Sequence, residues 1–292
     1  MYELHQVGAN TYYIAAPTNM GVYLAGEDAY LIDSGSSDRD AEAVLRIFGE
    51  KGWRLAAVLN THAHADHTGG NRRLQEATGC RIYANRAEAA IVEHSFLNTS
   101  LLYGGCPPQE MRVKYLYSEP CRAGALPSDG LPKGLEVVPL GGHSPEMVGF
   151  CTPDDVLFLA DAVSSEEAWE RGGILFLYHA GNTLATLDRV EQMSAKLYIA
   201  SHVEPREDIA PLVRFNRERI LAVRERILAQ VSDPVTADDL LGRLADGFGL
   251  KMNLFRYAIM GSTVRSYLAW MADEGAVLPI AEGGRLLWKR AE

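Results

Sequence analysis

Cysteines are few in this 292-residue sequence, and long apolar runs are missing. The four cysteines are scattered, with no CxxC pair, which excludes a disulfide-stapled mini-protein and favours reduced thiols. No stretch approaches the roughly 20 apolar residues that span a bilayer. The amino terminus, MYELHQVGAN, lacks the basic and apolar regions of a signal peptide. We therefore expect a cytoplasmic protein with no membrane partner.

Basic residues are also scarce, with 28 Lys and Arg against 38 Asp and Glu and a formal net charge of −10. This balance argues against a dedicated nucleic-acid-binding protein, because neutralising phosphates requires clustered Lys and Arg. The acidity is uneven, since residues 211–292 hold 12 basic and 10 acidic residues and the rest hold 16 and 28. Such a shift in charge predicts two units with different surfaces.

The hydrophobic pattern also divides the chain near residue 210. In residues 1–210 short apolar strand candidates alternate with amphipathic helical stretches, which predicts an α/β (α+β) domain layered around sheets. Residues 94–132, rich in Gly, Pro and Tyr, read as an insertion or lid within it. Residues 211–292 are mainly helical and close with a hairpin around a Gly-Gly turn, so they look like a small winged-helix domain.

The strongest chemical signal is the segment NTHAHADHTGG at residues 60–70. It follows an apolar strand candidate, so its side chains are expected in a loop at a strand end. Residues two apart in an extended segment face the same side, so His62 and His64 can bind one metal together. The neighbours Asp66 and His67 must diverge, which suits a second metal beside the first. Imidazole and carboxylate are ligands that zinc and related metals accept.

Three further candidate ligands each follow a strand candidate directly. They are His143 after residues 136–140, Asp161 after residues 156–159 and His202 after residues 197–200. A single histidine at a strand end is more often structural than functional. Together with the first segment, however, these residues form a set of five histidines and two aspartates.

This set resembles the metallo-β-lactamase-fold hydrolases, in particular the hydroxyacylglutathione hydrolase-like branch. The resemblance covers residues 1–205 and includes Asp33 in the segment LIDSG. It implies a four-layer αβ/βα sandwich with a binuclear metal site at one edge. The metals would be two divalent ions, zinc first, with iron or manganese as alternatives. By resemblance, His62, His64 and His143 hold the first metal, Asp66, His67 and His202 hold the second, Asp161 bridges both, and Asp33 orients ligands.

Such a ligand set implies hydrolysis by a hydroxide shared between the metals, with Asp66 orienting it. We predict a small-molecule substrate: an ester, a thioester or a lactone. The alternatives are a single-strand-specific endoribonuclease guided by the carboxy-terminal unit, an iron oxygenase or redox protein, and a non-enzymatic binding role.

Three residues outside the ligand set are candidate substrate contacts. Tyr103 lies in the insertion, and Tyr178 and His179 lie between Asp161 and His202. The arginines of residues 214–226 are interrupted by Glu218 and Glu225, which favours a solvated face of a packed helix over a nucleic-acid contact. A homodimer contact or a wall of the substrate pocket are further alternatives for that helix.

Overall fold

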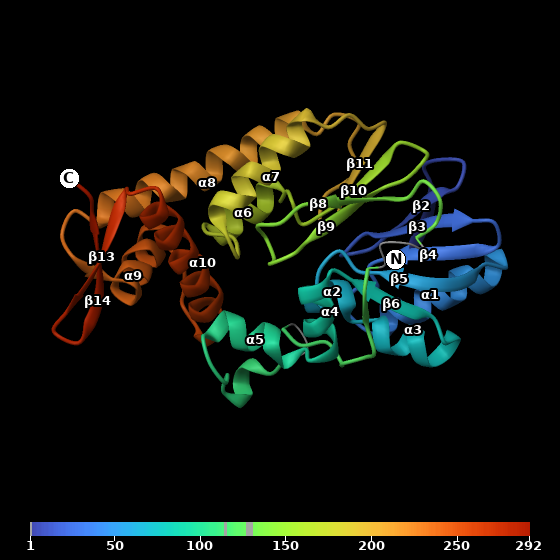
Figure 1. The fold of residues 1–292 in the computed structure, drawn as a ribbon, viewed down its shortest axis with the longest axis horizontal. Coiled ribbons are helices and arrows are strands. Elements are labelled where there is room, and N and C mark those ends of the chain that lie inside the picture. The colour runs from blue at the N-terminus through green and yellow to red at the C-terminus, as the bar shows by residue number, and fades with distance from the viewer. Residues whose placement is uncertain (1, 114–115, 127–130) are drawn as a thin grey trace.

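Two β-sheets lie face to face in the computed structural model, which describes residues 2–113, 116–126 and 131–292 (Figure 1). Helices cover the outer face of each sheet, and a smaller helical region carries the carboxyl terminus at the far end (Figure 1). No helix in the described part of the chain is both long and apolar enough to cross a membrane.

The first sheet has seven strands in chain order. Neighbours from β1 to β4 pair antiparallel, whereas those from β4 to β7 pair parallel. Parallel neighbours require crossover connections, which helices supply here. The strands are β1 (Glu3–Gln6), β2 (Thr11–Ala15), β3 (Met20–Ala25), β4 (Asp28–Ile32), β5 (Arg54–Leu59), β6 (Arg81–Ala84) and β7 (Gly124–Ala125). The helices are α1 (Asp38–Lys51), α2 (Ala65–Thr68), α3 (Asn71–Thr78) and α4 (Arg86–Glu93).

The second sheet has four strands in the order β11-β10-β9-β8. Strands β10 and β11 are parallel, and the other two pairs are antiparallel. The strands are β8 (Glu136–Pro139), β9 (Val148–Cys151), β10 (Val156–Ala160) and β11 (Leu197–Ala200). The helices that follow or connect them are α6 (Glu166–Gly172), α7 (Ala180–Gln192) and α8 (Ala210–Gln230).

Alternate residues of the strands enter different layers, as the two-residue period of a strand requires. Phe158 of β10 and Leu59 of β5 belong to the buried cluster between the sheets. Their neighbours point outward, so Leu157 packs in the cluster that contains Leu187 of α7, and Val58 in the cluster that contains α1. The predicted four-layer αβ/βα sandwich is therefore confirmed.

The predicted insertion at residues 94–132 contains helix α5 (Phe96–Tyr103) and a short 3₁₀ turn, η1 (Gln109–Met111). Leu102 and Met111 are buried in one cluster with Ala258 of the carboxy-terminal region. The segment is thus packed against the far end of the chain, and α5 lies beside α10 in Figure 1. Residues 114–115 and 127–130 of the insertion lie outside the described residues.

The carboxy-terminal region continues α8 with further helices and a three-stranded sheet in the order β12-β14-β13. Its elements are β12 (Val235–Thr236), α9 (Ala237–Gly247), α10 (Leu254–Asp273), β13 (Val277–Glu282) and β14 (Arg285–Arg290). Thr236 caps α9 by accepting a hydrogen bond from the backbone N–H of Asp239 at 3.0 Å. The hairpin turns at Gly283 and Gly284, both with positive φ, as predicted. The winged-helix assignment and the boundary at residue 210 stay predictions.

One buried cluster crosses that predicted boundary. It runs from the outer face of the second sheet through α8 into α9 and α10, and includes both Leu187 and Tyr267. Tyr267 is fully buried, and its hydroxyl donates to the carbonyl of Ile220 at 3.3 Å.

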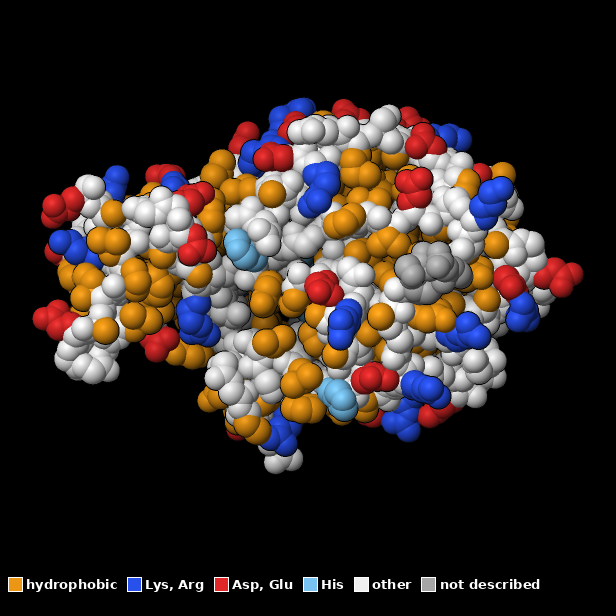
Figure 2. All heavy atoms as spheres, viewed as in Figure 1, with side chains coloured by type: hydrophobic (Ala, Val, Ile, Leu, Met, Phe, Trp, Pro, Cys, Tyr) orange, Lys and Arg blue, Asp and Glu red, His pale blue; other side chains and the backbone are white. Residues whose placement is uncertain are grey.

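On the face shown in Figure 2, Lys and Arg side chains (blue) are scattered among Asp and Glu (red).

Replacing Tyr267 tests whether this cluster is shared. Tyr267→Ala should lower the free energy of unfolding by about 3–5 kcal/mol, the range for a buried aromatic side chain. Tyr267→Phe loses only the hydrogen bond and should cost about 1 kcal/mol. Because both parts of the chain contribute to the cluster, urea unfolding followed by circular dichroism should show one transition for both variants. Two separate transitions would contradict a shared core.

Candidate metal centre

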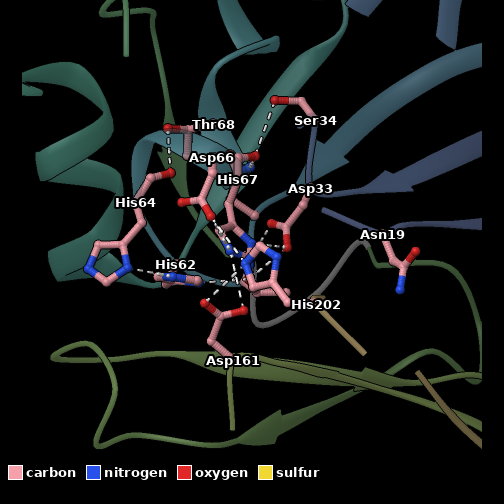
Figure 3. A network of polar contacts seen from close by, with 12 residues as sticks. Asn19, Asp33, Ser34, His62, His64, Asp66, His67, Thr68, Asp161 and His202 are labelled. Carbon is pink, nitrogen blue, oxygen red and sulfur yellow. Dashed lines mark hydrogen bonds and ion pairs between the residues drawn. The ribbon is translucent and has the colours of Figure 1, made fainter. Parts of the chain in front are cut away.

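The seven candidate ligands lie together where strands of both sheets end. Figure 3 labels all of them except His143. His62, His64, Asp66 and His67 come from the turn after β5 and the start of α2. The other three follow strands β8, β10 and β11. The side chains form two adjoining groups, a three-histidine cluster of His62, His64 and His143 and a mixed cluster of Asp66, His67, Asp161 and His202.

The three-histidine cluster turns one ring nitrogen of each residue toward a common point. His64 Nδ1 lies 2.9 Å from His62 Nε2 and 3.0 Å from His143 Nε2. Two nitrogens bound to one tetrahedral zinc would lie about 3.3 Å apart, given zinc–nitrogen distances near 2.0–2.1 Å. The spacing of these nitrogens therefore fits a single zinc-sized ion.

The mixed cluster combines two carboxylates with two imidazoles. Asp66 Oδ2 lies 3.2 Å from His202 Nε2, and Asp161 Oδ1 lies 3.4 Å from His67 Nε2. The second oxygen of Asp161 is 3.4 Å from His143 Nε2, so Asp161 reaches both clusters. His67 Nε2 and Asp161 Oδ1 are buried, and neither has a hydrogen-bond partner within the described ranges. Buried polar atoms are nearly always paired, so two orphaned ligand atoms that face one another suit a divalent ion between them.

Hydrogen bonds outside the clusters orient the ligand rings. Asp33 accepts from the backbone N–H and the hydroxyl of Thr61, both at 2.8 Å, and lies 2.8 Å from His67 Nδ1. His202 Nδ1 lies 2.9 Å from the carbonyl oxygen of Pro17. In His67 and His202 the outer nitrogen is thereby occupied as a donor, which leaves Nε2 facing the cluster.

Left-handed backbone occurs at three positions beside the ligands. Asp33 has φ +59°, Ala160 before Asp161 has φ +51°, and Gly142 before His143 has φ +132°. Only glycine adopts such angles freely, and a Cβ at Gly142 would lie 2.5 Å from the backbone nitrogen of Thr183. The backbone turns sharply at these points, where it directs the ligand side chains toward the centre.

The charges of the two clusters differ. Burial lowers the pKa of each histidine in the three-histidine cluster, that of His64 to about 3. Burial also opposes protonation of His67 and His202, but Asp161 and the other nearby carboxylates outweigh it and raise both pKa values, that of His202 to about 10. Burial would raise the pKa values of Asp66 and Asp161, yet the charge on His67 lowers both. Without metal, the first cluster is neutral, and in the second two protonated histidines face two carboxylates.

A cavity of about 530 Å³ opens beside the clusters and is lined by His64, Asp66, His143, Asp161 and His202. Its other walls are largely apolar and come from both parts of the chain. They include Leu102 of α5, Trp169 of α6, Phe176, Ile220 of α8 and Ile259 of α10.

The candidate substrate contacts separate in the structure. Tyr178 and His179 line a side cavity of about 300 Å³ that shares His64 and Phe176 with the larger one. Tyr103 is 40% exposed and belongs to neither lining among the described residues. Their roles stay predictions.

Two residues beside the clusters were not found from the sequence. The ring of Phe176 lies edge-on to His64 and His143, with centroids 5.4 and 5.5 Å away. A lone phenylalanine in a loop gives no signal of such a contact. Glu88 is buried against both ligand loops. Glu88 lies three residues before Ile91 and four before Val92, on the apolar face of α4. This helical spacing could have predicted that the charge is buried.

Comparison with known families agrees with this geometry. A family model described as the metallo-beta-lactamase superfamily matches residues 13–202. A hydroxyacylglutathione hydrolase of Rhodopseudomonas palustris (strain BisB18) is 29% identical over 160 residues, which cover 52% of this chain and 54% of that protein. One of Methylococcus capsulatus is 44% identical over 61 residues, covering 21% and 24%. The chain thus spans between about a quarter and about half of the length of these relatives.

Solved structures share the fold over nearly the whole chain. A beta-lactamase domain protein from Burkholderia ambifaria has a TM-score of 0.74 at 18% identity and covers 99% of this chain and 94% of its own. A metallo-beta-lactamase family protein from Thermus thermophilus has a TM-score of 0.70 at 20% identity, with coverages of 96% and 98%. The shared fold therefore extends over the carboxy-terminal region.

The charge difference predicts that metal affinity depends on pH in one cluster only. A metal must displace protons from His67 and His202, whose pKa values are raised, but none from the three-histidine cluster, whose pKa values are lowered. Zinc affinity of the mixed cluster should therefore rise about tenfold per pH unit for each displaced proton between about pH 6 and 8. That of the three-histidine cluster should stay nearly constant.

Calorimetric zinc titrations of two variants weaken one cluster at a time. Asp66→Ala retains the three-histidine cluster, and His143→Ala retains the mixed cluster. Equal pH slopes in the two variants would contradict the assigned charges.

Proposed function

The chain belongs to the metallo-beta-lactamase superfamily, and we propose that it is a hydrolase of small esters, thioesters or lactones that works with two divalent metal ions. The observation that carries this proposal is the pair of adjoining clusters that share Asp161. Histidine nitrogens with aspartate oxygens favour zinc, and iron or manganese remain the alternatives.

Metal ions bound there would polarise the scissile carbonyl and lower the pKa of a bound water. His62, His64 and His143 would hold one ion, and Asp66, His67 and His202 the other, with Asp161 between them. Asp33 and Thr61 keep the ring of His67 in place. The side chain of Asp66 is 35% exposed and lines the large cavity, so its carboxylate can accept a hydrogen bond from the attacking water.

The large cavity supports a small substrate with an apolar acyl group. Its volume of about 530 Å³ falls within the range of small-molecule sites, and its walls are mostly apolar. Arg171 is the only Lys or Arg among the described residues that line it, which suits one anionic group on the substrate. The relatives named hydroxyacylglutathione hydrolase favour a thioester.

The arginines of α8 give little support to the endoribonuclease alternative. Arg217 pairs with Asp188 and Glu191 at 2.7 Å each, and Arg224 contacts Glu274 at 3.3 Å. Arg226 lies over the ring of Phe248 at 4.2 Å. Arginines that already contact carboxylates and an aromatic ring of the same chain are less free to neutralise the phosphates of a nucleic acid. The face shown in Figure 2 likewise mixes the two signs.

A substrate panel with a matched pair of variants tests the proposed hydrolase. Metal-loaded protein should hydrolyse members of a set of acyl thioesters, esters and lactones, and should leave single-stranded RNA intact. Asp66→Asn keeps the size of the side chain but weakens its acceptor, so kcat should fall by about 10²–10⁴-fold. Asp188→Asn, on the exposed end of the Arg217 ion pair, is the control and should leave kcat unchanged. Metal-dependent cleavage of RNA without ester or thioester turnover would establish the alternative instead.

The shape of the cavity predicts selectivity by chain length. Ile259→Trp on α10 should fill part of the apolar wall and lower kcat/KM for long-chain acyl thioesters by roughly tenfold, while acetyl thioesters are little affected. Ile280→Trp on the β13 hairpin is the control, because Ile280 lies outside the cavity lining. An equal loss for short and long acyl groups would contradict this placement of the substrate.

A further inference from the structure

Glu88 of α4 is a buried carboxylate with both oxygens engaged, and the residue is only 1% exposed. Oε2 accepts the backbone N–H of Ala63 at 2.9 Å, and Oε1 accepts the backbone N–H of Glu146 at 2.9 Å and the hydroxyl of Ser144. Burying a carboxylate is costly unless its oxygens are satisfied, and here three donors satisfy them.

The three donors belong to the two loops that carry the three-histidine cluster. Ala63 stands between His62 and His64, whereas Ser144 is the first and Glu146 the third residue after His143. One carboxylate therefore connects two loops that are about 80 residues apart in the chain.

A second set of contacts fixes the start of α4 to the His143 loop. The side chain of Glu146 accepts the backbone N–H of Ala87 at 2.8 Å, and the amide of Asn85 donates to the carbonyl of Glu146 at 2.9 Å. Helix α4 and this loop are thus held together from both sides. The mixed cluster has no equivalent contact with Glu88 among the described residues, since its ligands are supported by Asp33 and Pro17.

The acceptor atoms of Glu88 matter at this position, and not only the volume of its side chain. An apolar side chain at this position would leave the three donors without an acceptor. What an apolar side chain cannot do is accept hydrogen bonds from two separate loops at once and so fix the distance between them.

We propose that Glu88 is a positioning residue, whose carboxylate fixes the turn of His62 and His64 against the loop of His143 and so sets the metal affinity of the three-histidine cluster. The inference rests on the metal centre of the proposed function. It distinguishes the two clusters, because Glu88 should have no effect on metal binding by the mixed cluster.

The test is Glu88→Gln in two backgrounds. Glutamine has the same shape, but its amide offers a single oxygen and turns an NH₂ group toward one of the loop donors. Zinc binding is measured against a chromophoric chelator in Asp66→Ala, which keeps the three-histidine cluster, and in His143→Ala, which keeps the mixed cluster. We expect zinc affinity to fall by about 10–100-fold in the first background, the range for losing an outer-shell partner, and to be unchanged in the second. Glu93→Gln is the control, because Glu93 lies on the same helix and, within the described residues, its side chain accepts only the N–H of Ala123, at 3.2 Å.

Unchanged affinity in the Asp66→Ala background, or an equal loss in both backgrounds, would overturn the proposal. If Glu88→Gln does not fold, Ser144→Ala replaces it, since it removes one of the three donors and keeps the carboxylate. Its zinc affinity in the first background should fall by roughly threefold, and an unchanged value would overturn the proposal. Binding is measured without substrate, so inactivity toward every ester would overturn the proposed function alone. Absence of zinc binding in the parent Asp66→Ala protein would overturn both.

Discussion

Parallel pairing within each sheet is the constraint on which the candidate metal centre depends. Strands β4 and β5 in the first sheet, and β10 and β11 in the second, run in the same direction as their partners and so end at a common edge. Asp33, the His62 turn, Asp161 and His202 follow these four strands in that order. Because the sheets face one another, candidate ligands up to 140 positions apart in the chain, His62 and His202, lie in one centre.

The two clusters of the candidate centre differ in their ligands and in their charge. Three neutral imidazoles present nitrogen donors that burial keeps unprotonated. Beside them, Asp66 and Asp161 carry the negative charge that a divalent ion requires. When no ion is bound, these carboxylates form ion pairs with His67 and His202. Part of the acidity of the first 210 residues is thus concentrated in a small volume. The nearly neutral carboxy-terminal region supplies apolar cavity walls instead, through residues such as Ile220 and Ile259.

The sequence predicted those features that depend on local patterns. His62, His64, Asp66 and His67 occur in one segment, and the remaining ligands could be found because each follows an apolar run. The apolar run at residues 156–159 likewise predicted a strand, which is β10. Contacts that depend on tertiary packing could not be predicted, such as the ring of Phe176 against two ligands. Residues 94–132 were predicted to be an insertion or lid, but nothing in their composition indicated that Leu102 would pack against α10.

The left-handed residues next to the ligands link the metal to the mechanics of the sandwich. Asp33 and Ala160 are not glycines, so each holds its backbone in a conformation that costs about 1–2 kcal/mol relative to the usual one. Such angles persist only where the surroundings impose them, and here both residues stand at the ends of central strands. A bound ion would therefore stabilise this strained backbone in addition to serving as a cofactor. Because Ala160 directly precedes Asp161 and Asp33 contacts His67, an ion at the candidate centre would hold the ends of β4 and β10 in these conformations.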